Sequence, residues 1–381
     1  MPDQQQGKTA RPATGRRALA GAAAALALLA AAFAAAQDIR FFTIGTGSTG
    51  GTYFPIGGMI ASAISSPPGA PPCERGGSCG VPGMIAVAQA SSGSVENLEN
   101  IRSGIIDSGL AQSDTAFWAY TGTGLYENIE PIEDLRAISH LYAEYIHIVV
   151  PAESDIQSIA DLRGRRVSLG AEGSGTLIDA RILLEIYGLG ENLIDSEFLS
   201  PEASSDLMLA NELDAYFVVG GVPFLAVEDL AESMPIRLLP IDGEAVERLL
   251  EEQPFFSAVV FAEGTYPGIG EVPTVAVGAD WLTSATLDEE LVYGITRALW
   301  HPTTRILLDN GHARGAEIRL EHALRGLAVP LHPGAARYYR EAGLLPDLSP
   351  PEPPPGPVRD SRSPRAPAVP PQSISESPAG P

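Results

Sequence analysis

The chain has 381 residues, of which 45% are hydrophobic and 19% are charged, and its formal net charge is −23. Such an acidic chain is a poor partner for nucleic acid or for an anionic membrane, which are themselves negatively charged. The same negative field opposes an anionic ligand, so such a ligand has to be held by local dipoles and hydrogen bonds. The six histidines stand singly and none has His-Glu-x-x-His spacing, so the sequence predicts neither a metal site nor a cofactor.

The first 36 residues have the pattern of an export signal. A basic segment with Arg16 and Arg17 precedes an apolar run over residues 18–33, and Ala36 ends an Ala-x-Ala cleavage site. An uncleaved N-terminal anchor is the alternative interpretation. No later stretch of the sequence approaches the roughly 18 apolar residues that a membrane-spanning helix requires. We therefore expect an exported chain that begins after Ala36.

The two cysteines of the chain, Cys73 and Cys79, lie in a loop rich in proline and glycine. An exported chain enters an oxidising compartment, where a local disulfide closing this loop is the expected state. The alternative is a metal site, but two cysteines without a nearby histidine do not supply four ligands.

The most informative stretch is a glycine- and hydroxyl-rich turn, GTGSTGG, at residues 45–51. An apolar, strand-like run precedes it, and a helix is predicted from Thr52. Free backbone N–H groups and the helix dipole favour an anion at a helix N-terminus, and glycines let the backbone approach that anion closely. The turn therefore predicts one half of a ligand clamp.

Two other interpretations of this turn stay open. Its glycines match Gly-x-Gly-x-x-Gly of dinucleotide-binding proteins, a motif that also needs a second strand ending in an acid about 20 residues later. At that distance, residues 65–77 form a loop broken by proline and glycine. Dinucleotide binding is therefore the weaker alternative, and a purely structural tight turn is the other.

Beyond this turn, segments with strand character alternate with segments with helix character. Strands are predicted at 84–90, 107–112, 135–142, 145–151, 167–170, 213–219, 237–240, 257–261 and 274–277. Helices are predicted at 95–102, from 113 onward, at 158–162, from the 172–176 turn through 186, after 223, and over 286–325 with a break near 301–302. This alternation is typical of a parallel sheet covered by helices. The roughly 310 residues involved suit two domains better than one.

A second turn, EGSGT at residues 172–176, is also rich in glycine and hydroxyl residues. It follows a predicted strand and opens a predicted helix, and the absence of a Gly-Lys-Ser/Thr sequence argues against nucleotide phosphate. In doubly wound sheets ligands lie beyond the carboxyl ends of the strands, where both turns fall. We therefore predict that the two turns form the two sides of a cleft, which closes on a small carboxylate.

Enzymatic alternatives find little support in the sequence. No Gly-x-Ser-x-Gly elbow surrounds Ser48, Ser94 or Ser174. His147 lies in an apolar strand, where a hydrogen-bonded core histidine is favoured. Asp114 is interpreted as a first-turn acid that satisfies the helix dipole, with a ligand ammonium as the competing partner. We expect a protein that is not an enzyme.

Nine segments together resemble one family of exported receptors, the TRAP-associated extracytoplasmic immunogenic (TAXI) proteins. They are, in chain order, IGTGSTGGTYFPIGG (44–58), GSVENL (93–98), GLAQSD (109–114), IHIVVP (146–151), DLRGRRVSLGAEGSGT (161–176), IRLLPIDGE (236–244), GTYPG (264–268), PTVAVGADWL (273–282) and LHPGAARYYREAG (331–343). The resemblance runs from about residue 39 to residue 345, and its first and fifth motifs are the specific ones.

The resemblance implies a two-lobed, type II periplasmic-binding-protein fold, in which each lobe is a mainly parallel sheet flanked by helices and the ligand cleft lies between them. Lobe I would comprise residues 37–148 and 259–345, and lobe II residues 149–258. The proline-packed residues 346–381 are predicted to be a disordered tail.

The resemblance also implies a function: a monomeric periplasmic receptor that carries a small carboxylate, such as a glutamate-like amino acid or an organic acid, to an ion-gradient-driven TRAP permease. The implied ligand contacts are Thr46, Gly47, Ser48, Thr49, Gly50, Gly51, Thr52, Tyr53, Gln112, Ser113, Tyr142, Ser174, Gly175, Thr176, Gly220, Gly221 and Val222. Arg181 is a candidate partner for the carboxylate. A receptor for an ATP-driven importer, a secreted enzyme and a ligand sensor on the same fold are the alternatives.

Overall fold

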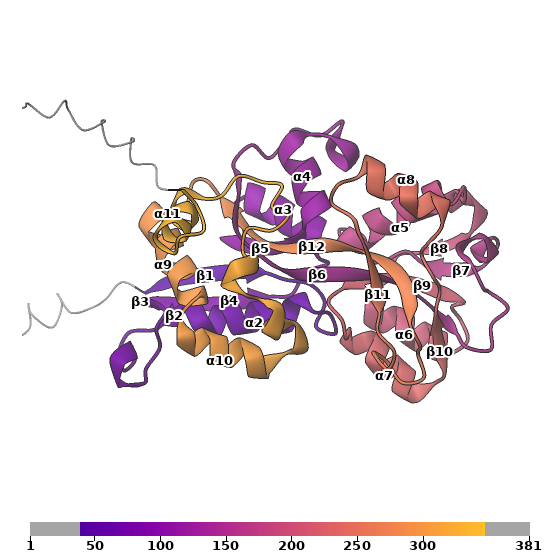
Figure 1. The fold of residues 1–381 in the computed structure, drawn as a ribbon, viewed down its shortest axis with the longest axis horizontal. Helices are drawn as coiled ribbons and strands as arrows, with labels where there is room; N and C mark the ends of the chain where they lie inside the picture. The colour runs from indigo at the N-terminus through magenta and orange to yellow at the C-terminus, as the bar shows by residue number, and fades with distance from the viewer. Residues whose placement is uncertain (1–38, 347–381) are drawn as a thin grey trace, which may run out of the picture. The chain divides into compact units, whose positions relative to one another are not determined.

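The computed structural model describes residues 39–346. The predicted export signal and all but the first residue of the predicted tail lie outside this range. Within it, the backbone forms one sheet of twelve strands with helices on both faces (Figure 1). The sequence prediction of an α/β fold, with strands flanked by helices, is confirmed.

The strands follow one another in the sheet in an order far from their order in the chain. They are β1 (Arg40–Gly45), β2 (Ser65–Ser66), β3 (Val81–Pro82), β4 (Met84–Gln89), β5 (Ser108–Gln112), β6 (Leu135–Pro151), β7 (Arg166–Ser168), β8 (Asp195–Glu197), β9 (Ala215–Gly220), β10 (Ile236–Leu238), β11 (Ser257–Phe261) and β12 (Val272–Ser284). The order across the sheet is β3-β2-β4-β1-β5-β12-β6-β9-β7-β8, with β10 beside β6 and β11 beside β12.

Two groups of parallel strands lie in this sheet. One consists of β4, β1 and β5, and the other of β9, β7 and β8. The long strands β12 and β6 run antiparallel to each other between these groups and pair with β5 and β9, respectively. The carboxyl ends within each parallel group therefore share one edge, where ligands bind in sheets of this kind.

The long strand β6 corrects a detail of the sequence prediction. Residues 135–142 and 145–151 were expected as separate extended runs, but β6 continues through Ala143 and Glu144 as one strand of 17 residues. Glu144, which stands between the two predicted runs, is 2% exposed and belongs to the strand. The lobe boundaries predicted near residues 148 and 258 fall within β6 and β11, and the division into lobes at those residues stays a prediction.

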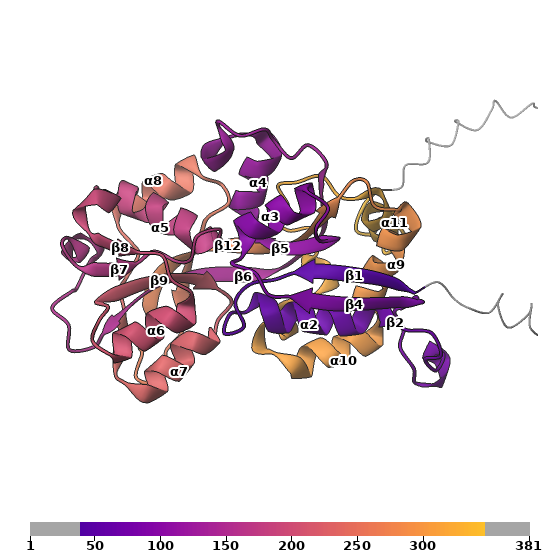
Figure 2. The same ribbon diagram turned by 180° about the vertical axis from the view of Figure 1, so that it is seen from behind.

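Ten α-helices of the described residues cover the sheet. They are α2 (Tyr53–Ile64), α3 (Ser94–Arg102), α4 (Ser113–Thr121), α5 (Gly175–Ile186), α6 (Pro201–Leu209), α7 (Leu225–Ser233), α8 (Glu244–Glu252), α9 (Glu289–Leu299), α10 (Pro302–Gly311) and α11 (Pro333–Glu341). Figure 2 shows α3, α4, α5 and α8 on one face of the sheet and α2, α6, α7 and α10 on the other. The helix predicted to reach residue 325 ends at Gly311, and residues 313–322 form two short 3-10 turns instead.

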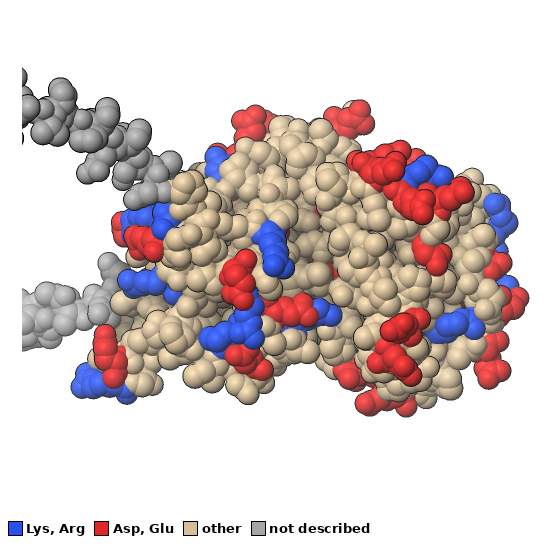
Figure 3. Space-filling model, in the orientation of Figure 1, with Lys and Arg blue, Asp and Glu red and all other residues tan. Residues whose placement is uncertain are grey.

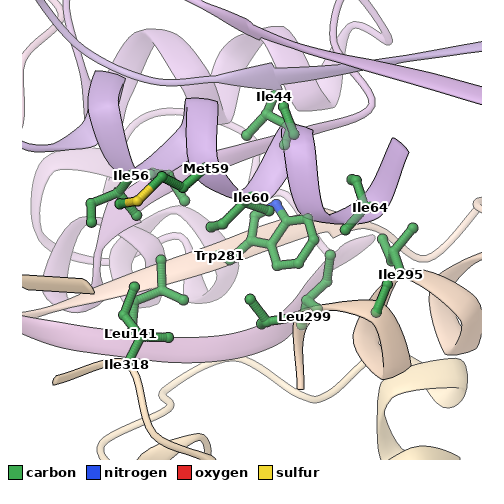
Figure 4. Close-up of a cluster of buried hydrophobic side chains, with 14 of the residues drawn as sticks. Ile44, Ile56, Met59, Ile60, Ile64, Leu141, Trp281, Ile295, Leu299 and Ile318 are labelled. Carbon is green, nitrogen blue, oxygen red and sulfur yellow. The ribbon is translucent and has the colours of Figure 1, made fainter. Parts of the chain in front are cut away.

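The largest core packs α2 against the sheet and against α9. Figure 4 shows the inner face of α2, with Ile56 and Ile60, lying over Trp281 of β12, while Ile295 and Leu299 approach from α9. Removing such side chains from water stabilises the fold by about 1.5–3 kcal/mol each. The first residues of α2 are therefore held rigidly against the sheet, and the turn before them is positioned by this core.

The surface of the described residues matches the acidic composition. On the face shown in Figure 3, acidic side chains gather over α7 and α8, and basic side chains are fewer and scattered. None of the helices in residues 39–346 combines the length and the apolar character needed to cross a membrane.

Candidate functional site

A cavity of about 210 Å³ lies at the carboxyl ends of the parallel strands. We call residues 47–53, 91–94 and 112 its first wall, and residues 170–176, 200–201 and 217–224 its second wall. The residues that line it are Gly47, Ser48, Gly51, Thr52, Tyr53, Ser91, Ser92, Gly93, Ser94, Gln112, Glu144, Gly170, Ala171, Ser174, Gly175, Thr176, Ser200, Pro201, Phe217, Val218, Val219 and Phe224. The first wall follows β1, β4 and β5, and the second follows or belongs to β7, β8 and β9.

Six helices begin at this cavity. The lining includes the first residues or caps of α2, α3 and α4 in the first wall and of α5, α6 and α7 in the second wall. Each N-terminus presents unpaired backbone N–H groups and a partial positive charge of about half an elementary charge. Their convergence makes the cavity favourable for a negative group although the protein as a whole is acidic.

The two walls differ in how these helix starts are capped. In the second wall the Ser174 hydroxyl accepts a hydrogen bond from the Leu177 N–H at 3.2 Å, and Ser200 accepts one from the Ala203 N–H at 3.3 Å. In the first wall, the caps of α2 and α3, Thr52 and Gly93, receive no such side-chain bond. The first wall nevertheless leaves no third-position N–H free, because α2 has Pro55 there and the Glu96 N–H of α3 donates to the Gly173 carbonyl at 3.0 Å.

No lysine or arginine is among the residues that line the cavity. Arg181, the carboxylate partner considered from the sequence, points elsewhere and pairs with Glu191, its Nε 2.7 Å from the glutamate oxygen. Arg314, which is 7% exposed, bonds Glu317 and lies over the ring of Tyr145, 5.2 Å from its centroid. Backbone amides and hydroxyls, and not a cationic side chain, supply the donors of the cavity wall.

Glu144 contributes a carboxyl group to the cavity from the middle of β6. The Tyr53 hydroxyl donates a hydrogen bond of 2.6 Å to its Oε2 atom. Burial, above all, raises the pKa of Glu144 well above its usual range, although this hydrogen bond acts in the opposite direction. Burial likewise raises the pKa of Tyr53. These two groups therefore favour their neutral forms.

Two carboxyl groups reach from the second wall to the first. The Glu202 Oε1 atom accepts a hydrogen bond of 2.6 Å from the Gly50 N–H. The Asp179 Oδ2 atom accepts one of 2.9 Å from Nε2 of Gln112, which lines the cavity. Thr52 adds a third connection, because its hydroxyl donates to the Gly221 carbonyl at 3.0 Å. In the form described here, the two walls are thus in direct contact.

The closest approach between the walls occurs at Gly175, the first residue of α5. A Cβ atom at this position would lie 1.4 Å from the Gln112 side-chain oxygen and 2.8 Å from the Ser94 hydroxyl. A glycine is therefore required for the start of α5 to reach the first wall.

The structure separates the residues predicted from the sequence into two groups. Those that line the cavity are Gly47, Ser48, Gly51, Thr52, Tyr53, Gln112, Ser174, Gly175 and Thr176. Those that do not are Thr46, Thr49, Gly50, Ser113, Tyr142, Gly220, Gly221 and Val222. For all of them, contact with a ligand stays a prediction.

Most members of the second group have structural contacts of their own. The Thr46 hydroxyl donates to the Gln89 carbonyl at 2.7 Å, and the Ser113 hydroxyl accepts from the Gly278 N–H at 3.1 Å. Thr49 is exposed, while Tyr142 is 2% exposed and its hydroxyl has no hydrogen-bond partner among the described residues. Val222 is joined to Pro223 by a cis peptide bond behind the second wall.

Several of the lining residues are not among those predicted from the sequence. Ser91, Ser92, Gly93 and Ser94 form a third hydroxyl- and glycine-rich turn before a helix, a pattern that is visible in the sequence. Glu144 carried no signal, because a single acid in an apolar strand does not reveal what faces it.

Two other sequence-based expectations concern residues outside the cavity. Cys73 and Cys79 are joined by a disulfide in the loop between β2 and β3. His147 is a core histidine, with its Nε2 atom 2.7 Å from the Tyr266 hydroxyl. Burial lowers the pKa of His147 to about 3, so this ring is neutral and structural.

Comparison with known proteins adds a family and several distant structural likenesses. The model of the NMT1-like family matches residues 44–343. The periplasmic aliphatic sulphonate binding protein SsuA from Escherichia coli is similar at 15% identity and a TM-score of 0.40, covering 79% of this chain and 83% of that chain.

Two further structures are similar at the same level. The alkanesulfonate-binding protein SsuA from Xanthomonas axonopodis pv. citri, bound to MOPS, has 18% identity and a TM-score of 0.42, covering 82% of this chain and 96% of that chain. A periplasmic binding protein from Brucella ovis with glutathione bound has 11% identity and a TM-score of 0.39, covering 69% and 67%. Likenesses this distant do not identify a ligand.

Proposed function

This chain belongs to the NMT1-like family, and we propose that it is an exported solute receptor that binds a small organic anion in the cavity between its two walls. The ligand class is a carboxylate, either a glutamate-like amino acid or an organic acid. The cavity of about 210 Å³ is smaller than the roughly 300–1,000 Å³ typical of sites for drug-sized ligands. The protein binds and releases this ligand and is not an enzyme.

The observation that carries this proposal is the convergence of six helix N-termini on one cavity that no lysine or arginine lines. Helix N-termini bind anions through free N–H groups and the helix dipole. The Ser48, Ser92 and Ser94 hydroxyls add donors that a carboxylate accepts. Such a site holds a monoanion without the strong field of an arginine, which suits a receptor that must also release its cargo.

Glu144 supports an amino acid over a simple organic acid. It places a carboxyl group in a cavity whose other polar lining consists of amides and hydroxyls. A ligand ammonium beside it would favour the ionised carboxylate, because an opposite charge within a few ångströms lowers the pKa of an acid. Asp114, considered from the sequence for this role, does not line the cavity, and Glu144 takes its place in the proposal.

The transporter partner is the finer part of the proposal. The nine motifs that resemble TAXI proteins support delivery, in the periplasm and by a monomer, to an ion-gradient-driven TRAP permease. A receptor for an ATP-driven importer would use the same cavity. A gene for a large multi-span permease beside this one, without an ATPase gene, would support the TRAP partner, and an ATPase gene there would contradict it.

A thermal-shift screen of residues 37–381 tests the ligand class. Amino acids, dicarboxylates, keto acids, alkanesulfonates and nicotinamide dinucleotides are added singly. A ligand at 100 times its dissociation constant stabilises the protein by about 2.7 kcal/mol. We expect a shift with glutamate-like amino acids or organic acids. A shift with dinucleotides alone would contradict the proposal, as would a shift confined to cationic compounds.

A further inference from the structure

Two aspartates from opposite walls meet below the cavity. Asp114 is the second residue of α4, two positions after the first-wall residue Gln112, and Asp179 lies in the first half of α5. Both side chains are 0% exposed. Gln112 also bonds Asp179, and each carboxyl group is close enough to influence the pKa of the other. Two ionised carboxylates at this separation would repel each other strongly in a medium with little solvent.

One oxygen of each aspartate already has a donor. The Oδ1 atom of Asp114 accepts from the Thr115 N–H at 2.6 Å, and the Oδ2 atom of Asp179 accepts from Nε2 of Gln112 at 2.9 Å. The remaining two oxygens, Asp114 Oδ2 and Asp179 Oδ1, are buried. If both carboxyl groups are ionised, and so can only accept, neither oxygen has a hydrogen-bond partner among the described residues. A buried acceptor left in this way is costly.

We propose that Asp114 and Asp179 form a proton-binding site between the two walls, in which one proton on Asp179 Oδ1 is donated to Asp114 Oδ2. This proton supplies the one donor that both orphan oxygens lack, and it removes the repulsion between the carboxylates. Asp179 is the protonated member, because Gln112 gives it a single neutral donor, whereas the backbone N–H and the hydroxyl of Thr115 both stabilise a charged Asp114.

The groups around the pair favour the same assignment. The carboxyl groups of Glu144 in β6 and Asp280 in β12 influence the pair, and ionisation of either one would oppose a second negative charge on it. The Nδ1 atom of His140 lies 3.0 Å from Asp280 Oδ1. Burial and then the charge of Asp114 raise the pKa of Asp179 well above its usual range. A divalent cation fits less well, because no third acidic or histidine ligand stands close enough to both aspartates within residues 39–346.

The site makes contact between the walls dependent on pH. When the proton leaves, the two carboxylates repel each other across the cleft, and the form with the walls apart is favoured. On the proposed function, ligand capture would then take up a proton, and loss of that proton would promote release. The proton site itself does not depend on which ligand the cavity binds.

The decisive experiment uses the ligand-free protein and the variant Asp179→Asn. The asparagine carbonyl can accept from Gln112 and its amide can donate to Asp114, so the variant copies the protonated pair without a titratable proton. Asp206→Asn, on the exposed face of α6, is the matched control. Urea-unfolding midpoints are measured from pH 5 to pH 8, and infrared spectra record the carbonyl stretch of protonated carboxyl groups.

The sign of the expected effect follows from the raised pKa of Asp179. A group whose pKa is higher in the folded state contributes stability that is lost as the pH rises through that value. The folding constant of the wild type should fall relative to that of Asp179→Asn by up to about tenfold per pH unit in this window. Asp206→Asn should follow the wild type at every pH.

The infrared spectra give a second readout. At pH 7 the wild type should show the protonated-carboxyl band of Asp179 beside that of the neutral Glu144; Asp179→Asn should lack only the Asp179 band, which Asp206→Asn retains. Parallel stability curves for the wild type and Asp179→Asn, or identical bands in both, would overturn the proton site. Because no ligand is present, this result is independent of the thermal-shift screen that tests the receptor function.

Discussion

Glu202 and Asp179 both reach from the second wall to the first, but they meet different partners. Glu202 meets the Gly50 N–H, 2.6 Å from its Oε1 atom, at the half-buried edge of the cleft. Asp179 is fully buried and meets the amide of Gln112 and the carboxyl group of Asp114. The same functional group therefore crosses the cleft in two electrostatic environments.

The difference appears in the pKa of each group. For Glu202, burial acts to raise the pKa, but hydrogen bonds from its own backbone, from Ser200 and from Gly50 together lower it. For Asp179, burial and the neighbouring Asp114 raise the pKa, and the one donor from Gln112 does not compensate. The contact made by Glu202 therefore depends on an ionised carboxylate, and we call it the anionic latch. The contact made by Asp179 depends on a proton, and we call it the proton-dependent latch.

The largest effect is expected where the two walls come closest. Gly175→Ala places a methyl group in the position that Gln112 occupies and so prevents both the Gln112–Asp179 contact and closure of the walls. We expect the ligand found in the thermal-shift screen to lose at least about 1.4 kcal/mol of binding free energy, a tenfold change in Kd. Calorimetric titration measures this directly.

Gly58→Ala is the control for that substitution. Gly58 lies in α2, and a Cβ atom there would meet nothing within 4 Å. Replacing it should stabilise the helix by about 0.5–1 kcal/mol and leave Kd unchanged. Equal affinities of Gly175→Ala and the wild type would show that the walls need not meet for ligand to bind.

An intermediate effect is expected at the anionic latch. Glu202→Gln keeps the shape of the side chain but removes a charge-assisted hydrogen bond, which contributes about 1.5–3 kcal/mol before solvent screening of this partly exposed group. The expected loss of stability is therefore at the lower end, about 1.5 kcal/mol. Urea unfolding at neutral pH measures it, and Glu212→Gln, on an exposed turn after α6, is the control.

The pH dependence of this variant separates the two latches. The pKa of Glu202 is lower in the folded state, so its contribution is present above the unfolded value near 4.5 and is lost as the pH falls through the folded value. The difference in unfolding free energy between the wild type and Glu202→Gln should therefore vanish as the pH falls. Over the same pH change, the unfolding free energy of the wild type should rise relative to that of Asp179→Asn. Differences of the same sign in both variants would contradict the comparison.

The smallest effect is expected at a helix cap that already has a partner. Ser174→Ala removes the acceptor for the Leu177 N–H at the start of α5, and loss of such a cap costs about 1 kcal/mol of stability. Ser174→Asp should restore the cap but place a negative charge in the cavity, so stability should recover while affinity for an anion falls. Thermal unfolding and calorimetric titration distinguish these outcomes. Tighter anion binding by Ser174→Asp would contradict a cavity built for a negative ligand.

Much of the site could be anticipated because its determinants are local in the chain. A run of glycines and hydroxyl residues between a strand and a helix specifies a turn with free N–H groups, and GTGSTGG and EGSGT were found on that basis. The alternation of strand and helix segments likewise indicated an α/β fold whose turns lie at the carboxyl ends of strands. These properties depend on a few consecutive residues and their backbone preferences.

The tertiary structure alone decided which of these turns meet and which acids face one another. Gln112 and Asp179 are 67 residues apart in the chain, and Gly50 and Glu202 are 152 apart, so no local pattern relates them. Glu144 became a cavity residue only because β6 continues between the two parallel groups of strands. The charge of a carboxyl group depends on its burial and its neighbours, which the sequence does not specify one residue at a time.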